Sequence, residues 1–266
     1  MIRDITLGQY YPGNSPIHKL DPRIKIIATI LFIVELFIVD NFLGFAVAAA
    51  ALMAAVAVSK VPLGYIVRGL KPVILILIFT FALNMFMVNG EVLWQWGFLR
   101  ITREGLRLAV FMAIRLVLLL IGSSMLTLCT RPLSLTDGIE RLLSPLKKIG
   151  VPAHEIAMMM TIALRFIPTL LEETDKIMKA QQARGADFET GNLIQRAKSL
   201  IPILVPLFVS AFRIAQDLAM AMEARCYRGG ENRTRMHQMK LVRRDYFAVV
   251  LMALFLILII LESRWF

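Results

Sequence analysis

The sequence predicts an all-α integral membrane protein, with about five transmembrane helices and a large cytoplasmic helical region that holds two long helices. Three observations support this class. Hydrophobic residues make up 58% of the 266 positions, and charged residues only 18%. The mean hydropathy is +0.69, which is more apolar than a soluble core requires. Apolar runs that approach membrane thickness also alternate with short, partly basic loops.

Five apolar runs are the predicted transmembrane segments. They cover residues 24–39, 42–58, 72–88, 106–130 and 246–261. Most are short against the roughly 20 residues that a hydrocarbon core needs, so their ends should extend into the loops. The second run is rich in alanine, and such small residues let helices approach closely in lipid. The basic loop 60–71 has room for a short interfacial helix, and residues 89–103 are expected to form an aromatic loop at headgroup level.

The predicted domains follow from these runs. Residues 1–130 hold the first four transmembrane helices, residues 131–245 form the cytoplasmic region, and residues 246–266 form the last transmembrane helix. Lys and Arg number four in residues 1–25 and three in 60–71, against none and two in the loops that alternate with them. Because cytoplasmic loops are enriched in these residues, the amino terminus is predicted to be cytoplasmic. The net charge of +11 has the same explanation, so no nucleic-acid partner is expected.

The first long helix of the cytoplasmic region is predicted to begin near Glu155. Apolar residues recur along it in steps of three and four, which keeps one face buried. Pro168 lies inside this helix and predicts a bend. Gly185 can close the helix in the left-handed conformation, and the Arg184 cation complements the terminal carbonyl groups.

The second long helix is predicted to begin at Asn192, where Gln195 completes a capping-box-like pair. Pro202 and Pro206 interrupt its apolar face and predict further bends. Arg225 lies at the carboxyl-terminal end of this helix. Both long helices therefore share one plan, an apolar and proline-bent segment that ends in an Ala-Arg step.

Four segments give the chain a specific resemblance to a known family. They are Ser15-Pro16-Ile17-His18-Lys19-Leu20-Asp21-Pro22-Arg23, Leu164-Arg165-Phe166-Ile167-Pro168-Thr169-Leu170, Ala180-Gln181-Gln182-Ala183-Arg184-Gly185 and Leu218-Ala219-Met220-Ala221-Met222-Glu223-Ala224-Arg225-Cys226-Tyr227. With these segments the chain resembles the transmembrane T component (EcfT) of energy-coupling factor transporters, the ABC-type importers of vitamins and metal ions in prokaryotes. The family's second motif usually reads Ala-Arg-Gly. This chain has Cys226 there, and Gly229 with Gly230 is expected to supply the turn instead.

The resemblance implies a coupling subunit in the prokaryotic cell (inner) membrane. In this family two arginines dock in grooves on two ABC ATPase subunits. The ATPase-docking residues implied for this chain are Ala183, Arg184, Gly185, Ala224, Arg225 and Cys226. The resemblance also implies a substrate-binding membrane partner, the S component, within the lipid bilayer. ATP is then bound by the ATPase partners, this chain needs no cofactor, and the S component sets which vitamin or other micronutrient is transported.

The motif content agrees with a subunit that is not an enzyme. The sequence has no G-x-x-x-x-G-K-[ST] phosphate loop, no H-E-x-x-H, no C-x-x-C and no G-x-S-x-G. Its three histidines and two cysteines are scattered, so no catalytic, metal or disulfide site is expected. Two alternatives stay open. One is a dedicated cobalt or nickel type of T component, and the other is a self-sufficient secondary carrier, which should show internal repeats and mid-membrane ionisable residues.

One ionisable pair is predicted inside the membrane. Arg115 lies within the fourth apolar run, where an unpaired charge is costly, and Glu35 in the first run is the expected partner. The helix rise places the two residues at depths that an arginine side chain can nearly bridge. A structural ion pair is expected here rather than a transport pathway.

Overall fold

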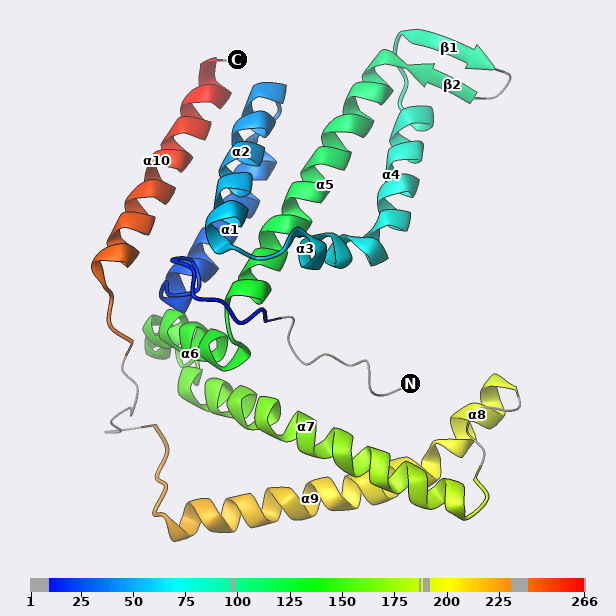
Figure 1. Cartoon of the computed structure of the whole chain (residues 1–266), viewed down its shortest axis with the longest axis vertical. Coiled ribbons are helices and arrows are strands. Elements are labelled where there is room, and N and C mark those ends of the chain that lie inside the picture. Colours follow the sequence, from blue (N-terminus) through cyan, green and yellow to red (C-terminus); the bar gives the residue numbers. More distant parts are fainter. Residues whose placement is uncertain (1–9, 97–98, 187, 189–191, 231–238, 266) are drawn as a thin grey trace. The chain divides into compact units, whose positions relative to one another are not determined.

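A computed structural model describes residues 10–96, 99–186, 188, 192–230 and 239–265 (Figure 1). The chain divides into two compact units. Among the described residues, one unit comprises residues 10–138 and 239–265, and the other comprises the described residues from 139 to 230. This division falls inside a helix, α6 (Pro132–Leu143), whereas the predicted domain boundary at residue 131 marks the end of the preceding helix.

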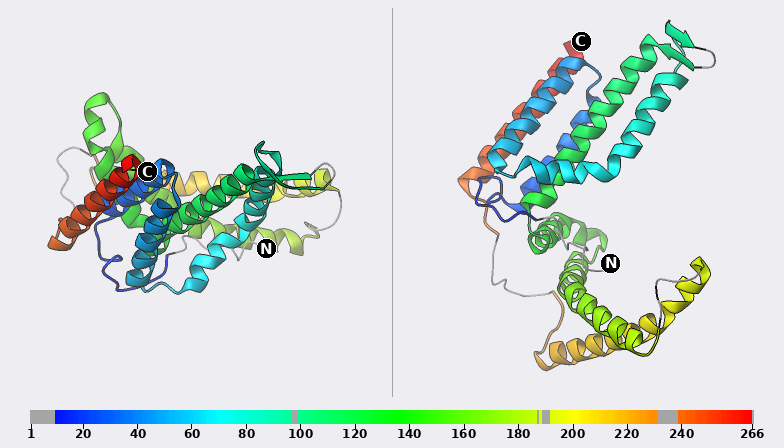
Figure 2. Two further views of the ribbon diagram at one scale, coloured as in Figure 1. Left: turned by 90° about the horizontal axis from the view of Figure 1, so that it is seen from above. Right: turned by 45° about the vertical axis from the view of Figure 1, so that its right-hand side comes forward.

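The first unit is a bundle of apolar helices. They are α1 (Pro22–Ile38), α2 (Phe42–Ser59), α4 (Ile74–Met87), α5 (Arg103–Cys129) and α10 (Arg243–Trp265). The α5 helix is central, because α1, α2, α3 (Leu63–Leu70) and α4 all pack against it, and α10 packs against α1 and α2. Figures 1 and 2 show these helices side by side. Each of the five apolar runs predicted from the sequence therefore corresponds to one helix.

Small residues bring the helices of this bundle close together. In α2 the buried positions Gly44, Ala48, Leu52 and Val56 are four residues apart, so they form one stripe. A Cβ atom on Gly122 of α5 would come within 2.7 Å of the Phe32 ring on α1. The core around this stripe holds Leu36, Val39, Phe45, Ala48, Leu52, Leu118 and Ile259. The alanine-rich run therefore packs as the sequence predicts.

Two connections inside this unit have defined structure. The basic loop forms α3, the short helix that its sequence allows, followed by a 3₁₀ helix at Lys71–Val73. The loop between α4 and α5 is an antiparallel hairpin of β1 (Val92–Trp96) and β2 (Leu99–Thr102). The sequence predicted an aromatic loop at headgroup level here and missed this hairpin.

Large apolar side chains face outward over much of the bundle. Leu75 of α4 is 77% exposed, and Phe247 of α10 is 69% exposed. Such a surface would be unfavourable in water and suits lipid contact. Six described helices are long and apolar enough to cross a membrane, namely α2, the α3–α4 segment, α5, α7 (Ala153–Ala183), α9 (Ile201–Ala224) and α10. The six helices leave out α1, which was one of the five predicted spans but has only 17 residues. They add α7 and α9, which were predicted to be cytoplasmic and have the lowest mean hydropathies of the six.

The second unit is built from the two long helices. The α7 helix begins two residues before the predicted start and ends at the predicted residue. The second predicted helix is divided at Leu200 into α8 (Leu193–Ser199) and α9. Gln195 Oε1 accepts a hydrogen bond from the Asn192 backbone N–H at 3.1 Å, which is half of the predicted capping box. Figure 1 shows α7 and α9 crossing near the end of α7.

Candidate functional site

The two Ala-Arg steps end their helices with the same backbone geometry. At the end of α7 the N–H of Gly185 donates to Gln182 O at 2.9 Å, and the N–H of Ala186 donates to Gln181 O at 3.0 Å. At the end of α9 the N–H of Cys226 donates to Glu223 O at 2.8 Å, and that of Tyr227 to Met222 O at 3.0 Å. Both ends are Schellman motifs, with Arg184 and Arg225 as the C-cap residues.

This geometry requires a left-handed residue directly after each arginine. Gly185 has φ +87°, and Cys226 has φ +55°. Glycine adopts this conformation without strain, whereas a residue with a Cβ atom does so at a cost. The expectation that Gly229 and Gly230 replace the missing glycine is therefore wrong. Cys226 makes the turn itself, and Gly229 adds a second left-handed residue at φ +89°.

Replacing Cys226 by glycine is expected to stabilise the end of α9. The substitution removes the left-handed strain of about 1–2 kcal/mol and adds a backbone entropy cost of about 0.5–1 kcal/mol, for a net gain of up to about 1.5 kcal/mol. Thermal unfolding of the purified protein in detergent measures the change. The matched variant Gly185→Ala should lower the midpoint, and a lower midpoint for Cys226→Gly would contradict the strain argument.

Both arginines are exposed and available. Within the described ranges, no residue forms an ion pair with Arg184 or Arg225. Gln181 Nε2 donates to Pro202 O at 3.3 Å, so the end of α7 lies beside the start of α9. Arg225 lies at the other end of α9, whose 24 residues span about 36 Å. We call the two helix ends that carry Arg184 and Arg225 the tips. The two tips are therefore separated by roughly the length of α9.

A histidine ties the segment after Arg225 to the start of α7. His154 Nδ1 is 3.1 Å from Glu140 Oε1, and His154 Nε2 is 3.3 Å from the Tyr227 hydroxyl. Gly230 passes so close to this ring that an added Cβ atom would lie 2.5 Å from His154 Cδ2. The segment that follows Arg225 is therefore attached at both sides, to the end of α9 through the chain and to the α6–α7 junction through His154. The sequence pattern gave no signal for this contact, because its members are 14 and 73 residues apart.

The three prolines do not have equivalent positions. Pro168 lies inside the continuous helix α7, and Pro206 lies inside α9. Pro202 lies in the first turn of α9, where a proline interrupts no helical hydrogen bond. Pro202 therefore marks the start of a helix rather than a bend within one. Bending at Pro168 and Pro206 stays a prediction.

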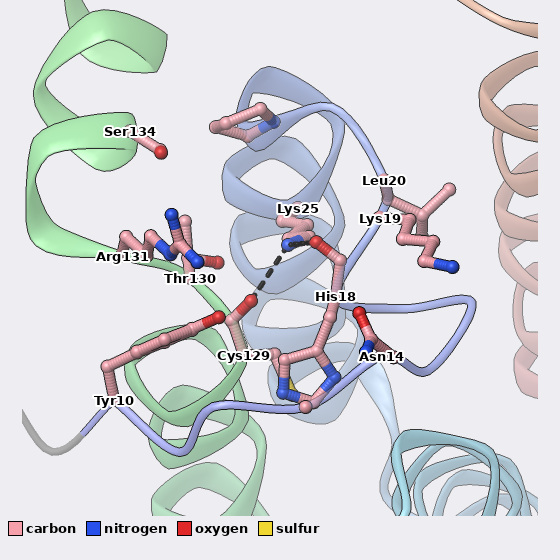
Figure 3. A pocket seen from close by; sticks show the side chains of 12 residues that line it. Tyr10, Asn14, His18, Lys19, Leu20, Lys25, Cys129, Thr130, Arg131 and Ser134 are labelled. Atoms are coloured by element: carbon pink, nitrogen blue, oxygen red, sulfur yellow. Dashed lines mark hydrogen bonds between the residues drawn. The ribbon is translucent and has the colours of Figure 1, made fainter.

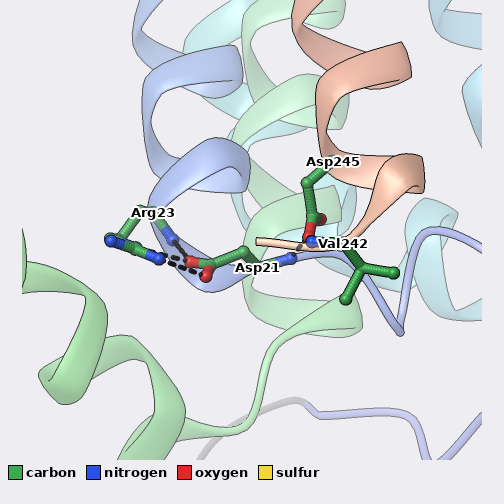
Figure 4. A network of polar contacts seen from close by, with 4 residues as sticks. All are labelled: Asp21, Arg23, Val242 and Asp245. Atoms are coloured by element: carbon green, nitrogen blue, oxygen red, sulfur yellow. Dashed lines mark hydrogen bonds and ion pairs between the residues drawn. The ribbon is translucent and has the colours of Figure 1, made fainter. Parts of the chain in front are cut away.

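The Ser15–Arg23 segment forms a polar anchor where α1 begins (Figure 4). Asp21 caps the helix, since its Oδ1 accepts the backbone N–H of Arg23 at 2.9 Å. The Arg23 guanidinium bonds both carboxylate oxygens of Asp21, at 3.0 and 2.7 Å. The backbone N–H of Asp21 donates to Asp245 Oδ1 at 2.9 Å, and Asp245 Oδ2 accepts from the Val242 N–H at 2.7 Å. The anchor thus joins the starts of α1 and α10.

Asp21 makes this anchor sensitive to acid. Burial acts to raise the pKa of the Asp21 carboxyl, but the hydrogen bonds and the charge of Arg23 outweigh burial and hold this pKa below its usual value. A lowered pKa in the folded chain means that ionised Asp21 stabilises the fold above the unfolded pKa. This contribution is lost as the pH falls through the folded pKa.

Arg115 pairs with a different carboxylate from the one predicted. Its Nη2 donates to Val39 O at 2.8 Å and to Asp40 Oδ1 at 3.2 Å. Glu35 is only 3% exposed, and no described side chain bonds its carboxylate. The predicted Glu35–Arg115 pair is therefore wrong, because the carboxylate that pairs with Arg115 is that of Asp40. The guanidinium extends to the end of α1, where free carbonyl groups and the following turn offer acceptors.

Comparison with known proteins finds a matching family model and several similar proteins. The model of the family described as CbiQ, Cobalt transport protein, matches residues 13–236. A protein of Clostridium kluyveri named energy-coupling factor transporter transmembrane protein EcfT is 60% identical over 266 residues, which cover 99% of this chain and 98% of the relative. Proteins of the same name from Ruminiclostridium cellulolyticum and Bacillus subtilis are 56% and 46% identical, covering 100% and 94% of this chain and 100% and 95% of the relatives. The chain therefore belongs to the CbiQ/EcfT family, as the transmembrane T component of an energy-coupling factor transporter.

Proposed function

We propose that this chain couples ATP hydrolysis by two ABC ATPase subunits to the movement of a substrate-binding S component in the prokaryotic cell membrane. The observation that carries the proposal is the pair of matching helix ends that present Arg184 and Arg225. Each ATPase subunit would receive one tip. The chain itself would hydrolyse nothing and bind no cofactor, since ATP would be held by the partners.

The tips have the chemistry that docking in a protein groove needs. A guanidinium offers five N–H donors in a planar arrangement, so it can donate to two carboxylate or carbonyl oxygens at once. Because Arg184 and Arg225 have no described internal partner, docking would break no existing ion pair. The separation of about 36 Å along α9 suits two binding sites on different subunits better than one shared site.

The α9 helix offers a surface for the S component. Its exposed apolar residues include Ile201, Leu204, Val205, Phe208, Val209 and Phe212, with exposed fractions from 47% to 68%. Two large rings, Phe208 and Phe212, are one helical turn apart and therefore share a face. A membrane partner with its own apolar surface would cover this face. The same helix would then contact an ATPase at its tip and the S component along its length.

The amino terminus and both tips would lie in the cytoplasm, where ATP is available, and the enrichment of Lys and Arg in the loops on that side supports this orientation. A self-sufficient carrier would need ionisable groups in the middle of the membrane, and Arg115 is instead engaged at the end of α1. The named relatives are energy-coupling factor transporter transmembrane proteins, and the substrate proposed for this transporter is a vitamin or another micronutrient. The description of the matching family keeps a dedicated cobalt or nickel type as the second candidate.

Proteoliposomes that contain this chain, two ATPases and an S component test the proposal. Uptake should require ATP hydrolysis, and Pro168→Ala with Pro206→Ala should lower uptake per ATP because straightened helices transmit less movement. The matched control is Pro202→Ala, which lies at a helix start and should leave the ratio unchanged. Uptake that proceeds without the ATPases would show a secondary carrier, and an unchanged ratio in the double variant would remove the bends from the mechanism.

A further inference from the structure

A polar cavity of about 300 Å³ lies where α1 begins, α5 ends and α6 begins (Figure 3). This volume equals roughly ten molecules of liquid water. Its lining residues are Tyr10, Gly13, Asn14, His18, Lys19, Leu20, Pro22, Lys25, Cys129, Thr130, Arg131 and Ser134. Three of them are cations, Lys19, Lys25 and Arg131, and none is acidic. The Asp21 carboxylate of the anchor is paired with the Arg23 guanidinium at 2.7 Å.

Lys25 is fixed at one wall of the cavity. It is 7% exposed, and its Nζ donates to His18 O at 3.0 Å and to Cys129 O at 2.9 Å. An ammonium group has three donors, so one remains for a ligand. Desolvation lowers the pKa of the His18 imidazole, which disfavours its charged form, and both ring nitrogens are engaged by Ser15 and Tyr11.

Thr130 supplies an unused donor beside this ammonium group. The residue is 4% exposed, and its buried hydroxyl has no hydrogen-bond partner within the described parts of the chain. A buried hydroxyl without a partner costs roughly 1–3 kcal/mol, so a ligand that accepts its hydrogen bond would recover this cost. The next residue, Arg131, holds its guanidinium 5.6 Å from the centre of the Tyr10 ring, at the mouth of the cavity.

The start of α6 adds a positive helix end. Ser134 belongs to the first turn of α6 and lines the cavity. The first backbone N–H groups of a helix lack intrahelical partners, and the helix dipole favours an anion there. Two cations, Lys25 and Arg131, a spare hydroxyl donor and a helix start therefore line one space, and none of its described lining residues is acidic.

We propose that this cavity binds a phosphate group, carried either by the headgroup of an anionic lipid or by a free phosphate. The phosphate oxygens accept from Lys25 Nζ, the Thr130 hydroxyl and the Arg131 guanidinium, which matches the preference of phosphate for charged donors. The site is distinct from the helix tips, and it does not depend on the coupling function proposed above.

The test uses the full-length protein with Arg131→Gln and Thr130→Val. The Arg131 side chain is exposed and contacts one ring, and Thr130 has an extended backbone that valine also adopts, so both variants should fold. Lys71→Gln is the matched control, because Lys71 is an exposed cation outside the cavity. The probes are dioleoylphosphatidylglycerol against phosphatidylcholine in nanodiscs, and inorganic phosphate against chloride at equal ionic strength.

Lipid retention is counted by native mass spectrometry, and phosphate binding is followed by the thermal midpoint. Retention of phosphatidylglycerol that falls about tenfold or more in both cavity variants, but not in Lys71→Gln, identifies a headgroup site. A phosphate-dependent rise in midpoint that the same two variants lose identifies free phosphate. If neither probe separates the cavity variants from Lys71→Gln, the proposal is overturned.

Discussion

Reversing the charge at both tips, with Arg184→Glu and Arg225→Glu, is expected to abolish association with the ATPase subunits while the chain stays in the membrane. Loss of one buried partner of a charge pair costs at least about 2 kcal/mol at an interface, which is roughly a thirtyfold loss of affinity per tip. A glutamate also repels any carboxylate that lines the groove. Copurification from a membrane extract, with the stoichiometry of bound ATPase measured, checks the result.

A matched control separates docking from general charge effects. Arg165→Glu with Arg213→Glu changes the same number of exposed charges on the same two helices, but in the middle of each helix and away from its end. This control should retain the ATPases. Stoichiometric ATPase on the tip variant would rule out docking through the two arginines, and equal losses in both variants would point to a nonspecific electrostatic effect.

The second large effect is expected at the anchor, where Asp245→Ala should destabilise the first unit by about 2–6 kcal/mol. Asp245 is 3% exposed and accepts the backbone N–H groups of Asp21 and Val242. Its loss leaves two donors without partners, each at a cost of roughly 1–3 kcal/mol. Thermal unfolding in detergent measures the change.

Two further variants define the origin of this effect. Asp245→Asn keeps one acceptor oxygen and turns the other into a donor, so its loss should be about half that of alanine. Asp217→Ala removes an exposed aspartate and should leave the midpoint nearly unchanged. If Asp245→Ala unfolds at the same temperature as Asp217→Ala, the anchor does not contribute to stability.

The sequence predicted well what depends on local pattern. The start and end of the apolar runs match α1, α2, α4, α5 and α10 within a few residues, because length and hydrophobicity suffice to define a helix in lipid. The end of α7 at Ala183 was also predicted correctly, since glycine after arginine specifies a helix stop. These features need no information from distant parts of the chain.

The features that the sequence analysis missed depend on the rotation of a helix about its axis or on contacts between residues far apart in the chain. Periodicity gives the depth of Arg115 in the membrane, but it does not give the rotation of α5, which decides between Glu35 and Asp40 as partner. The turn at Cys226 was missed because cysteine has no preference for the left-handed conformation. The break at Leu200 was missed because apolar periodicity continues through it, and the hairpin after α4 was missed because aromatic residues suit both strands and membrane interfaces.

The hydrogen bond between Asp21 and Asp245 sets an order of events during synthesis. The two residues are 224 positions apart, so at roughly 5–20 residues per second the ribosome needs on the order of 10–45 s to reach the second after the first. During this interval α1 has emerged, while the N–H of Asp21 still lacks its final acceptor. Closing so long a loop costs little more entropy than closing one of half the length. The delay is therefore set by translation rather than by chain entropy, and the α1 end of the bundle is completed only when the start of α10 arrives.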